Sequence, residues 1–193
     1  MVIRQCNFSL TNGKISVIIY VIETNLIKEE IKLRRIAVCP GSFDPVTLGH
    51  LDIITRASRL FDKVIVLISR NAGKSQPSFT ATERMIMIES VTRGLDNVVI
   101  DILDGLLADY VKNVGAIAIV KGLRAVSDFE YEFQMALANK KLYSGAETVF
   151  LTTTAENMYL SSSVVKQIAY FGGDISHFVP ETILDDIQRR LIK

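Results

Sequence analysis

Hydrophobic residues follow two alternating spacings along this chain. Short continuous apolar runs, typical of strands buried on both faces, lie at residues 36–39, 64–69, 98–103, 116–120 and 148–151. Between and after these runs, apolar residues recur at helical spacing in segments 49–61, 80–91, 106–113, 129–142 and 163–171. This alternation of strand and helix predicts an α/β fold, a single doubly wound (Rossmann-like) domain with a five-stranded parallel sheet.

Turn and capping residues support these boundaries. Thr80 and Glu83 have the spacing of a capping box, which predicts a helix start. Gly115 and the pair Gly172-Gly173 follow helical segments and predict their ends. Pro180 is expected at the first position of a last helix, because its fixed φ and missing N–H suit that position.

The loop after the first strand is the most informative segment. Pro40-Gly41 has turn chemistry, and helical spacing begins at Gly49. A strand, a polar loop and a helix N-terminus therefore converge, and unpaired N–H groups with the positive helix dipole favour an anion there. Ser42 can add a hydroxyl donor, and His50 can place an imidazole N–H beside the same anion. The segment predicts a nucleotide phosphate site, with Asp44 expected to brace the turn.

Composition narrows the function. At 193 residues, a single domain with a sizeable core is expected. The chain has 22 Lys and Arg against 21 Asp and Glu, a formal charge of +1, which argues against bulk nucleic-acid binding and makes any anion site local. Cys6 and Cys39 have no disulfide-framework or metal spacing, and Cys39 is expected in the core. Without a convincing secretory signal, a cytoplasmic location is expected.

Residues 1–32 do not fit the pattern of the remaining chain. Their apolar run at 15–22 is far shorter than the about 20 residues of a membrane helix, and its flanks lack a small-residue cleavage pattern. An extra strand, a buried arm and a translated upstream stretch all stay open. We therefore divide the chain into an N-terminal extension of unassigned role, 1–32, and one domain, 33–193, and expect no membrane association.

A Walker A loop is excluded. Gly73-Lys74-Ser75 resembles the tail of that motif, but the motif needs a glycine five residues before Gly73, where Ile68 stands. Taken by itself, Lys74 is equally well an ordinary solvated loop lysine.

Several motifs resemble those of the nucleotidylyltransferase superfamily. Thr47-Leu48-Gly49-His50 resembles its T/H-x-G-H signature, and Leu160-Ser161-Ser162-Ser163, with Lys166 three residues on, resembles its late serine cluster. The segment 121–132, KGLRAVSDFEYE, is very similar to the R-G-L-R-x-x-x-D-F-E-Y-E segment of the bacterial phosphopantetheine adenylyltransferases. With Pro-Gly-Ser-Phe-Asp-Pro at 40–45, the resemblance is specific to that family and covers 33–193, about five-sixths of the chain, as a nucleotidylyltransferase domain.

The resemblance implies transfer of the adenylyl group of ATP to 4′-phosphopantetheine, giving dephospho-coenzyme A and pyrophosphate in coenzyme A biosynthesis. Such a reaction needs in-line positioning and donors that meet developing charge rather than a protein nucleophile. The implied catalytic residues are His50, which donates to the α-phosphate, and Lys74. The implied acceptor site consists of Ser42, Lys74, Leu107 and Lys121. The implied ATP site consists of Ser42, Phe43, His50, Gly122, Leu123, Arg124, Glu132, Asn157, Met158, Tyr159, Leu160, Ser161, Ser162 and Ser163.

The resemblance also implies a cofactor and an assembly. Mg²⁺ would screen the ATP phosphates. Because the sequence has no dense carboxylate cluster, the ion is expected to be held mostly by phosphate and water, without a protein metal site. The implied assembly is a homohexamer. ATP and 4′-phosphopantetheine are the expected substrates, with neither nucleic acid nor a membrane as a partner.

The chain departs from the family pattern at positions that bear on binding. Lys121 replaces the usual arginine and loses its planar fork. Asn157 stands where a large aromatic residue is common, and Tyr170 where many members carry an arginine. The loop with Lys74 is one residue longer than usual. These changes affect the expected contacts with adenine, with the ATP phosphates and with the acceptor phosphate.

Two other functions stay open. A related cytidylyl- or adenylyltransferase acting on glycerol phosphate or nicotinamide mononucleotide would use the same loop, although the segment 121–132 argues against it. A catalytically silent nucleotide-binding module would keep the glycine loop without needing His50. At the level of residues, His50 could be structural, the serines at 161–163 could only cap a helix, and Glu132 could lie on a solvated helix start.

Overall fold

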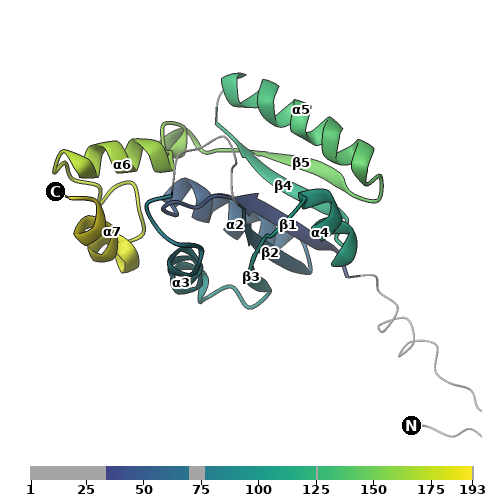
Figure 1. Ribbon diagram of the computed structural model, residues 1–193, viewed down its shortest axis with the longest axis horizontal. Coiled ribbons are helices and arrows are strands. Elements are labelled where there is room, and N and C mark those ends of the chain that lie inside the picture. Colours follow the sequence, from purple (N-terminus) through teal and green to yellow (C-terminus); the bar gives the residue numbers. More distant parts are fainter. Residues whose placement is uncertain (1–33, 70–76, 125, 193) are drawn as a thin grey trace, which may run out of the picture. The chain divides into compact units, whose positions relative to one another are not determined.

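The computed structural model describes residues 34–69, 77–124 and 126–192, so residues 1–32, Cys6 and Lys74 lie outside the described parts. No helix within these ranges is long and apolar enough to cross a membrane. The elements, labelled in Figure 1, are β1 (Ile36–Gly41), α2 (Leu48–Leu60), β2 (Lys63–Ile68), α3 (Ala81–Thr92), β3 (Val98–Ile102), α4 (Leu107–Asn113), β4 (Ala118–Leu123), α5 (Val126–Leu142), β5 (Glu147–Thr152), η1 (Ala155–Asn157), α6 (Ser162–Tyr170), η2 (Glu181–Ile183) and α7 (Leu184–Leu191).

The strands form one parallel sheet of 5 strands in the order β3-β2-β1-β4-β5. β1 is central, because it pairs with β2 on one side and with β4 on the other. The chain first winds outward through β2 and β3 and then returns past β1 to add β4 and β5 (Figure 1). This reversal creates a topological switch point at the carboxyl ends of β1 and β4, the place where such sheets bind ligands. The predicted fold class is confirmed.

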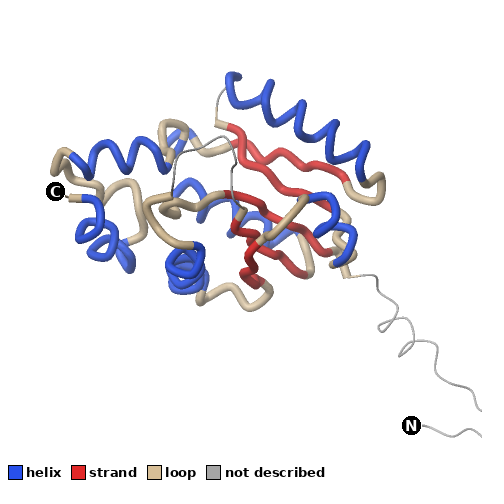
Figure 2. Tube along the Cα trace, viewed as in Figure 1, coloured by secondary structure: helices blue, strands red, loops and turns tan. Residues whose placement is uncertain are grey.

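Successive residues of each strand face opposite sides of the sheet. From β1, Ala37 and Cys39 face a core completed by α2, α3, α6 and α7, whereas Val38 faces a second core completed by α4. All three side chains are buried, which confirms the core position expected for Cys39. Helices therefore cover both faces of the sheet (Figure 2). Burial on both faces explains why β1, β2 and the first half of β4 are continuous apolar runs rather than alternating ones.

The predicted start of β4 is wrong by two residues. The strand begins at Ala118, because the Ala116 N–H bonds back to the Val111 carbonyl (3.0 Å) and Gly115 ends α4 with a φ of 65°. The strand also continues beyond the apolar run to Leu123, since its polar end still pairs with β5. This extension carries Lys121, and Arg124 directly after the strand, to the switch point.

The two capping predictions had different outcomes. The capping box is present, with the Glu83 N–H donating to Thr80 Oγ1 (3.2 Å) and the Thr80 N–H donating to Glu83 Oε2 (2.7 Å). Pro180 does not occupy the first position of the last α-helix. It precedes a 3₁₀ turn, Glu181–Ile183, and α7 begins only at Leu184. The fixed φ of proline suits the start of that tighter turn equally well.

Candidate active site

A pocket of about 1060 Å³ opens at the switch point. Its walls come from the β1–α2 loop, the start of α2, the end of β4, α4, α5 and the start of α6. Most of the site residues predicted from the sequence line this pocket. They are Ser42, Phe43, His50, Leu107, Lys121, Gly122, Arg124, Glu132, Asn157, Leu160, Ser161, Ser162 and Ser163. The fold therefore brings residues from both ends of the domain into one cavity.

The other predicted site residues are placed differently. Leu123, Met158 and Tyr159 are outside the described lining of the pocket. Met158 and Tyr159 are exposed, and the Tyr159 ring packs edge-on against Phe178 with centroids 5.9 Å apart. Lys74 lies outside the described residues.

His50 is held by the residue that precedes its helix. Thr47 caps α2: its hydroxyl oxygen accepts the His50 backbone N–H (3.3 Å), and its own N–H donates to His50 Nδ1 (3.1 Å). The Thr47 hydroxyl also lies 3.0 Å from this ring nitrogen. An Nδ1 that accepts a backbone N–H carries no proton, so the neutral ring has its N–H at Nε2. The ring packs edge-on against Phe43, with centroids 5.1 Å apart, so both its tautomer and its orientation are set.

Two glycines allow a close approach of backbone and side chains around this histidine. A Cβ at Gly41 would lie 2.8 Å from the Phe43 ring, which folds back over the end of β1. Phe43 itself has a φ of 48°, a left-handed conformation that is uncommon for a bulky residue. At the end of β4, a Cβ at Gly122 would lie 2.9 Å from Ile53 Cγ1 on α2. Gly122 therefore lets α2 pack directly on β4.

The serine cluster begins α6 at another wall of the pocket. Ser161 caps the helix by accepting the Val164 N–H (3.1 Å), and Ser162 Oγ donates to the Pro45 carbonyl (2.8 Å). Ser163 is exposed and lines the pocket. The capping role considered for these serines is thus present at Ser161. Because α2 and α6 both begin at the pocket, the positive ends of two helix dipoles meet there and favour an anion.

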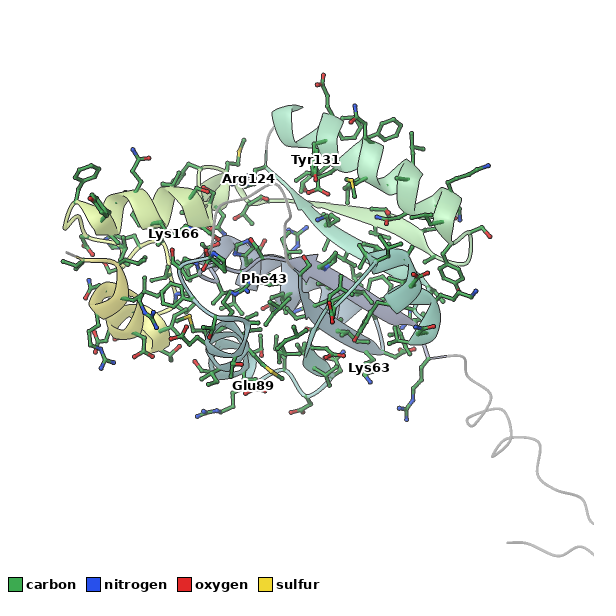
Figure 3. The ribbon with its side chains drawn as sticks, viewed as in Figure 1. Phe43, Lys63, Glu89, Arg124, Tyr131 and Lys166 are labelled. Atoms are coloured by element: carbon green, nitrogen blue, oxygen red, sulfur yellow. The ribbon has the colours of Figure 1, made fainter. Side chains whose placement is uncertain are left out.

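Two basic side chains reach the pocket from the end of β4. Lys121 Nζ lies 3.1 Å from Glu132 Oε2 on α5, and the two side chains are 25% and 20% exposed. The alternative of a fully solvated Glu132 is therefore wrong. Arg124 Nη1 donates to the Leu160 carbonyl (2.9 Å), which joins the end of β4 to the serine segment. Figure 3 shows Arg124 above Phe43, toward α5 and α6.

Asp44 braces the loop from outside the pocket, as expected from the sequence. Its Oδ1 accepts the Phe79 N–H (2.9 Å), and its Oδ2 accepts the Ser78 N–H (3.1 Å). Lys166 Nζ, on α6, donates to the same Oδ2 at 2.7 Å. The Asp44 side chain is 8% exposed, so water cannot readily replace these donors. One carboxylate therefore joins the β1–α2 loop, the segment before α3 and α6.

Sequence reasoning missed Arg84, which holds the same loop. Its side chain is buried and Nη1 donates to the Ser42 carbonyl at 2.6 Å. Burial lowers the pKa of Arg84, and the nearby Asp44 charge opposes that shift. An arginine in a helix is usually exposed to solvent, so nothing in the local sequence identifies Arg84 as a buried residue. The role of Thr47 was also missed, although the Thr-x-x-His spacing up to His50 is that of a capping box.

Two of the residues that depart from the family pattern contact neighbouring residues in the structure. Asn157 Nδ2 donates to Thr154 Oγ1 (3.0 Å) within the turn that precedes the serine segment. Tyr170 is 47% exposed at the end of α6 and packs edge-on against Phe171. Asn157 thus contributes to the pocket wall, whereas Tyr170 is outside the described lining.

Comparison with known proteins places this geometry in a family. The model of the cytidylyltransferase-like family matches residues 38–168. The chain is 54% identical over 159 residues to a phosphopantetheine adenylyltransferase of Caldanaerobacter subterraneus subsp. tengcongensis, a match that covers 82% of this chain and 99% of the relative. It is 51% identical over 156 residues to a phosphopantetheine adenylyltransferase of Alkaliphilus metalliredigens, covering 81% of this chain and 99% of the relative.

A solved structure shares the fold. It is a crystal structure from Vibrio parahaemolyticus, provisionally assigned as a nicotinate-nucleotide adenylyltransferase, with a TM-score of 0.61. The alignment covers 82% of this chain and 96% of that one. At 20% sequence identity, this similarity extends to the architecture alone.

We predict that Asp44→Ala lowers the free energy of unfolding by about 2–4 kcal/mol, because it leaves two backbone N–H groups and the Lys166 ammonium without their shared acceptor. Urea denaturation followed by circular dichroism measures the loss. Asp186→Ala is the matched control, since its ion pair with Arg189 is exposed and should be worth less than about 1 kcal/mol. Equal losses for the two variants would contradict the bracing role.

Proposed function

This chain belongs to the phosphopantetheine adenylyltransferase family, within the cytidylyltransferase-like proteins, and from that premise we propose how its pocket performs the reaction. It transfers the adenylyl group of ATP to 4′-phosphopantetheine, giving dephospho-coenzyme A and pyrophosphate. One observation carries the assignment of residues: a single pocket joins His50, Lys121 of β4, Arg124 directly after that strand, and two helix N-termini.

The chemistry needs little covalent participation by the protein. An oxygen of the acceptor phosphate forms a bond to the α-phosphorus of ATP, the bond from that phosphorus to the bridging β-phosphate oxygen breaks, and pyrophosphate leaves with the electron pair. Catalysis therefore depends on in-line positioning and on donors that meet negative charge. We assign the principal donor to His50, because the Thr47 contact leaves Nε2 carrying the ring proton.

The acceptor phosphate is assigned to Lys121 and Ser42. The Ser42 backbone is fixed by its carbonyl bond with Arg84, so its hydroxyl starts from a defined position. Lys74 is proposed as a further phosphate and catalytic lysine on the family resemblance alone. Leu107 and Met135 give the pocket an apolar wall between α4 and α5, which suits the uncharged arm of the acceptor.

The ATP phosphates are assigned to Arg124 and to the N-terminus of α6. The bond from Arg124 to Leu160 supports this assignment, because it holds the guanidinium beside the serine segment. The remaining proposed ATP contacts are Ser42, Phe43, His50, Gly122, Leu123, Glu132, Asn157, Met158, Tyr159, Leu160, Ser161, Ser162 and Ser163. Of these, Met158 and Tyr159 contribute only through backbone or rim contacts, since their side chains are exposed.

The proposal includes Mg²⁺ as the counter-ion of the ATP phosphates. Within the described parts of the chain, no three His, Cys, Asp or Glu side chains gather as a protein metal site requires. Phosphate oxygens and water would therefore supply most of the ligands, as Mg²⁺ commonly prefers at nucleotide sites. A cytoplasmic location is also proposed, and the free thiol of Cys39 suits a reducing compartment.

A homohexamer is the proposed assembly, and α5 supplies its physical support. None of the described side chains of this helix is buried in the single subunit. Large apolar residues are among those exposed, including Phe133 (45%), Leu137 (57%) and Leu142 (62%). Exposed apolar surface of this extent is typical of a protein–protein interface. Other copies of the chain, arranged with closed symmetry, would cover it.

The substrate assignment is tested with a panel of acceptors. We expect ATP with 4′-phosphopantetheine to give the highest kcat/KM for pyrophosphate release, because the pocket offers a phosphate site beside a long apolar wall. Nicotinamide mononucleotide and glycerol phosphate, each with ATP and with CTP, are the competing pairs. Faster turnover of CTP with glycerol phosphate would contradict the assignment. ATP binding without pyrophosphate release would instead favour a silent nucleotide-binding module.

His50→Ala is predicted to lower kcat by about 10²–10³-fold, the scale for losing one preorganised donor to developing charge. The affinity for ATP should change much less, because the lost bond strengthens in the transition state. The second histidine of the chain provides the control: His177 is outside the described lining of the pocket, so His177→Ala should leave kcat near that of the parent. A near-native kcat for His50→Ala would leave this residue a structural role only.

For the assembly, we expect the full chain to sediment as a hexamer at micromolar concentration. Phe133→Glu and Leu137→Glu together should shift it to smaller species, because charge on the exposed face of α5 opposes burial. Sedimentation velocity measures both chains. A monomeric parent would contradict the proposal, and repeating the run after removal of residues 1–32 would show whether the N-terminal extension is the cause.

A further inference from the structure

The ion pair between Lys121 and Glu132 lies inside the pocket where the two substrates are proposed to meet. Lys121 comes from the end of β4 and Glu132 from α5, and both line the cavity. The Nζ to Oε2 distance is 3.1 Å, and both side chains are largely shielded from solvent. The lysine assigned to the acceptor phosphate is therefore in contact with a carboxylate before any substrate arrives.

A second observation places the Lys121 charge beside the end of β1. Cys39 of β1 and Lys121 of β4 both line the pocket, and the two strands pair in the sheet. Burial raises the pKa of the Cys39 thiol to about 12, and the Lys121 ammonium opposes this shift. Cys39 lies three residues before Ser42, the first residue after β1. The ammonium thus acts on the region between β1 and β4, where an acceptor phosphate would contact Ser42.

Glu132 and an acceptor phosphate would compete for this ammonium. A lysine offers three donors on one compact charge, and it lacks the planar fork with which an arginine can serve two anions from different edges. A carboxylate in contact with Nζ also repels a second anion brought to the same nitrogen, and screening by water is weak in a shielded site. The phosphate must therefore displace Glu132 from Lys121 or bind beside it against that repulsion.

We propose that Glu132 is an intramolecular competitor for Lys121, which makes it a specificity-determining residue for the acceptor. An uncharged or weakly charged terminal group cannot displace a carboxylate from an ammonium, whereas a phosphate dianion can. Glu132 therefore lowers the affinity for the true acceptor while excluding acceptors of lower charge. This inference rests on the proposed function, because it takes Lys121 as the residue that holds the acceptor phosphate.

The test is the affinity of the full-length protein for 4′-phosphopantetheine without ATP, measured by isothermal titration calorimetry. Glu132→Gln, which removes the charge and keeps the shape, should bind about three- to tenfold more tightly than the parent. Pantetheine, which lacks the phosphate, should show no comparable gain. Glu130→Gln is the matched control, because Glu130 lies two residues earlier on α5, is exposed and is outside the described lining of the pocket.

The same measurement in a Lys121→Met protein tests whether the gain in affinity depends on Lys121. In Lys121→Met protein, adding Glu132→Gln should change the affinity for 4′-phosphopantetheine by less than about twofold, since the Lys121 ammonium for which Glu132 competes has been removed. Glu132→Ala provides an independent variant if Glu132→Gln does not fold, and it should also bind the phosphate acceptor more tightly. Thermal melts of each variant show that the compared proteins are folded.

Three results would overturn the inference. They are an unchanged or weaker affinity for 4′-phosphopantetheine in both Glu132 variants, an equal gain for pantetheine, and a gain that persists in the Lys121→Met background. In each of these cases pyrophosphate release by the parent from ATP and 4′-phosphopantetheine leaves the proposed function standing. A parent that neither binds 4′-phosphopantetheine nor releases pyrophosphate would overturn the proposed function together with the inference.

Discussion

The connectivity around β1 is the constraint on which the site depends. Because β1 is the central strand and the chain reverses beside it, the loop after β1 and the end of β4 must lie together at one edge of the sheet. Helices that follow the strands then begin at this edge, α2 and α6 among them. A site for an anion follows from this arrangement of backbone dipoles, and side chains then decide which anion binds and what happens to it.

Local sequence patterns predicted the elements because burial and helix capping are local properties. The apolar runs located the strands, and the spacing from Thr80 to Glu83 located the start of α3. The pairing of Asp44 with Lys166 could not be found in this way, since 122 positions separate the two residues and only the folded chain joins them. Resemblance to family motifs predicted more of the site than the chemistry of individual residues did. It selected both Glu132 and Lys121 for the pocket, whereas the ion pair between them became apparent only from the structure.

Two groups of charged residues around the site serve separate purposes. Asp44, Arg84 and Lys166 lie behind the β1–α2 loop and hold a conformation that includes the positive φ of Phe43. Such a conformation persists only where several contacts over-determine it. Lys121, Arg124 and Glu132 lie in the pocket itself, where their fields act on bound anions. The contacts that hold the loop therefore do not depend on the charges that face the cavity.

The bond from the Thr47 N–H to His50 has a consequence for the protons of the catalytic cycle. Because Nδ1 accepts this bond, the N–H that the neutral ring offers to a ligand is at Nε2. In the proposed reaction His50 therefore presents one donor, and the residue that caps α2 sets its position. Such a donor can meet developing charge by hydrogen bonding alone, comparable to a backbone amide in an oxyanion hole, and no proton transfer is required of it.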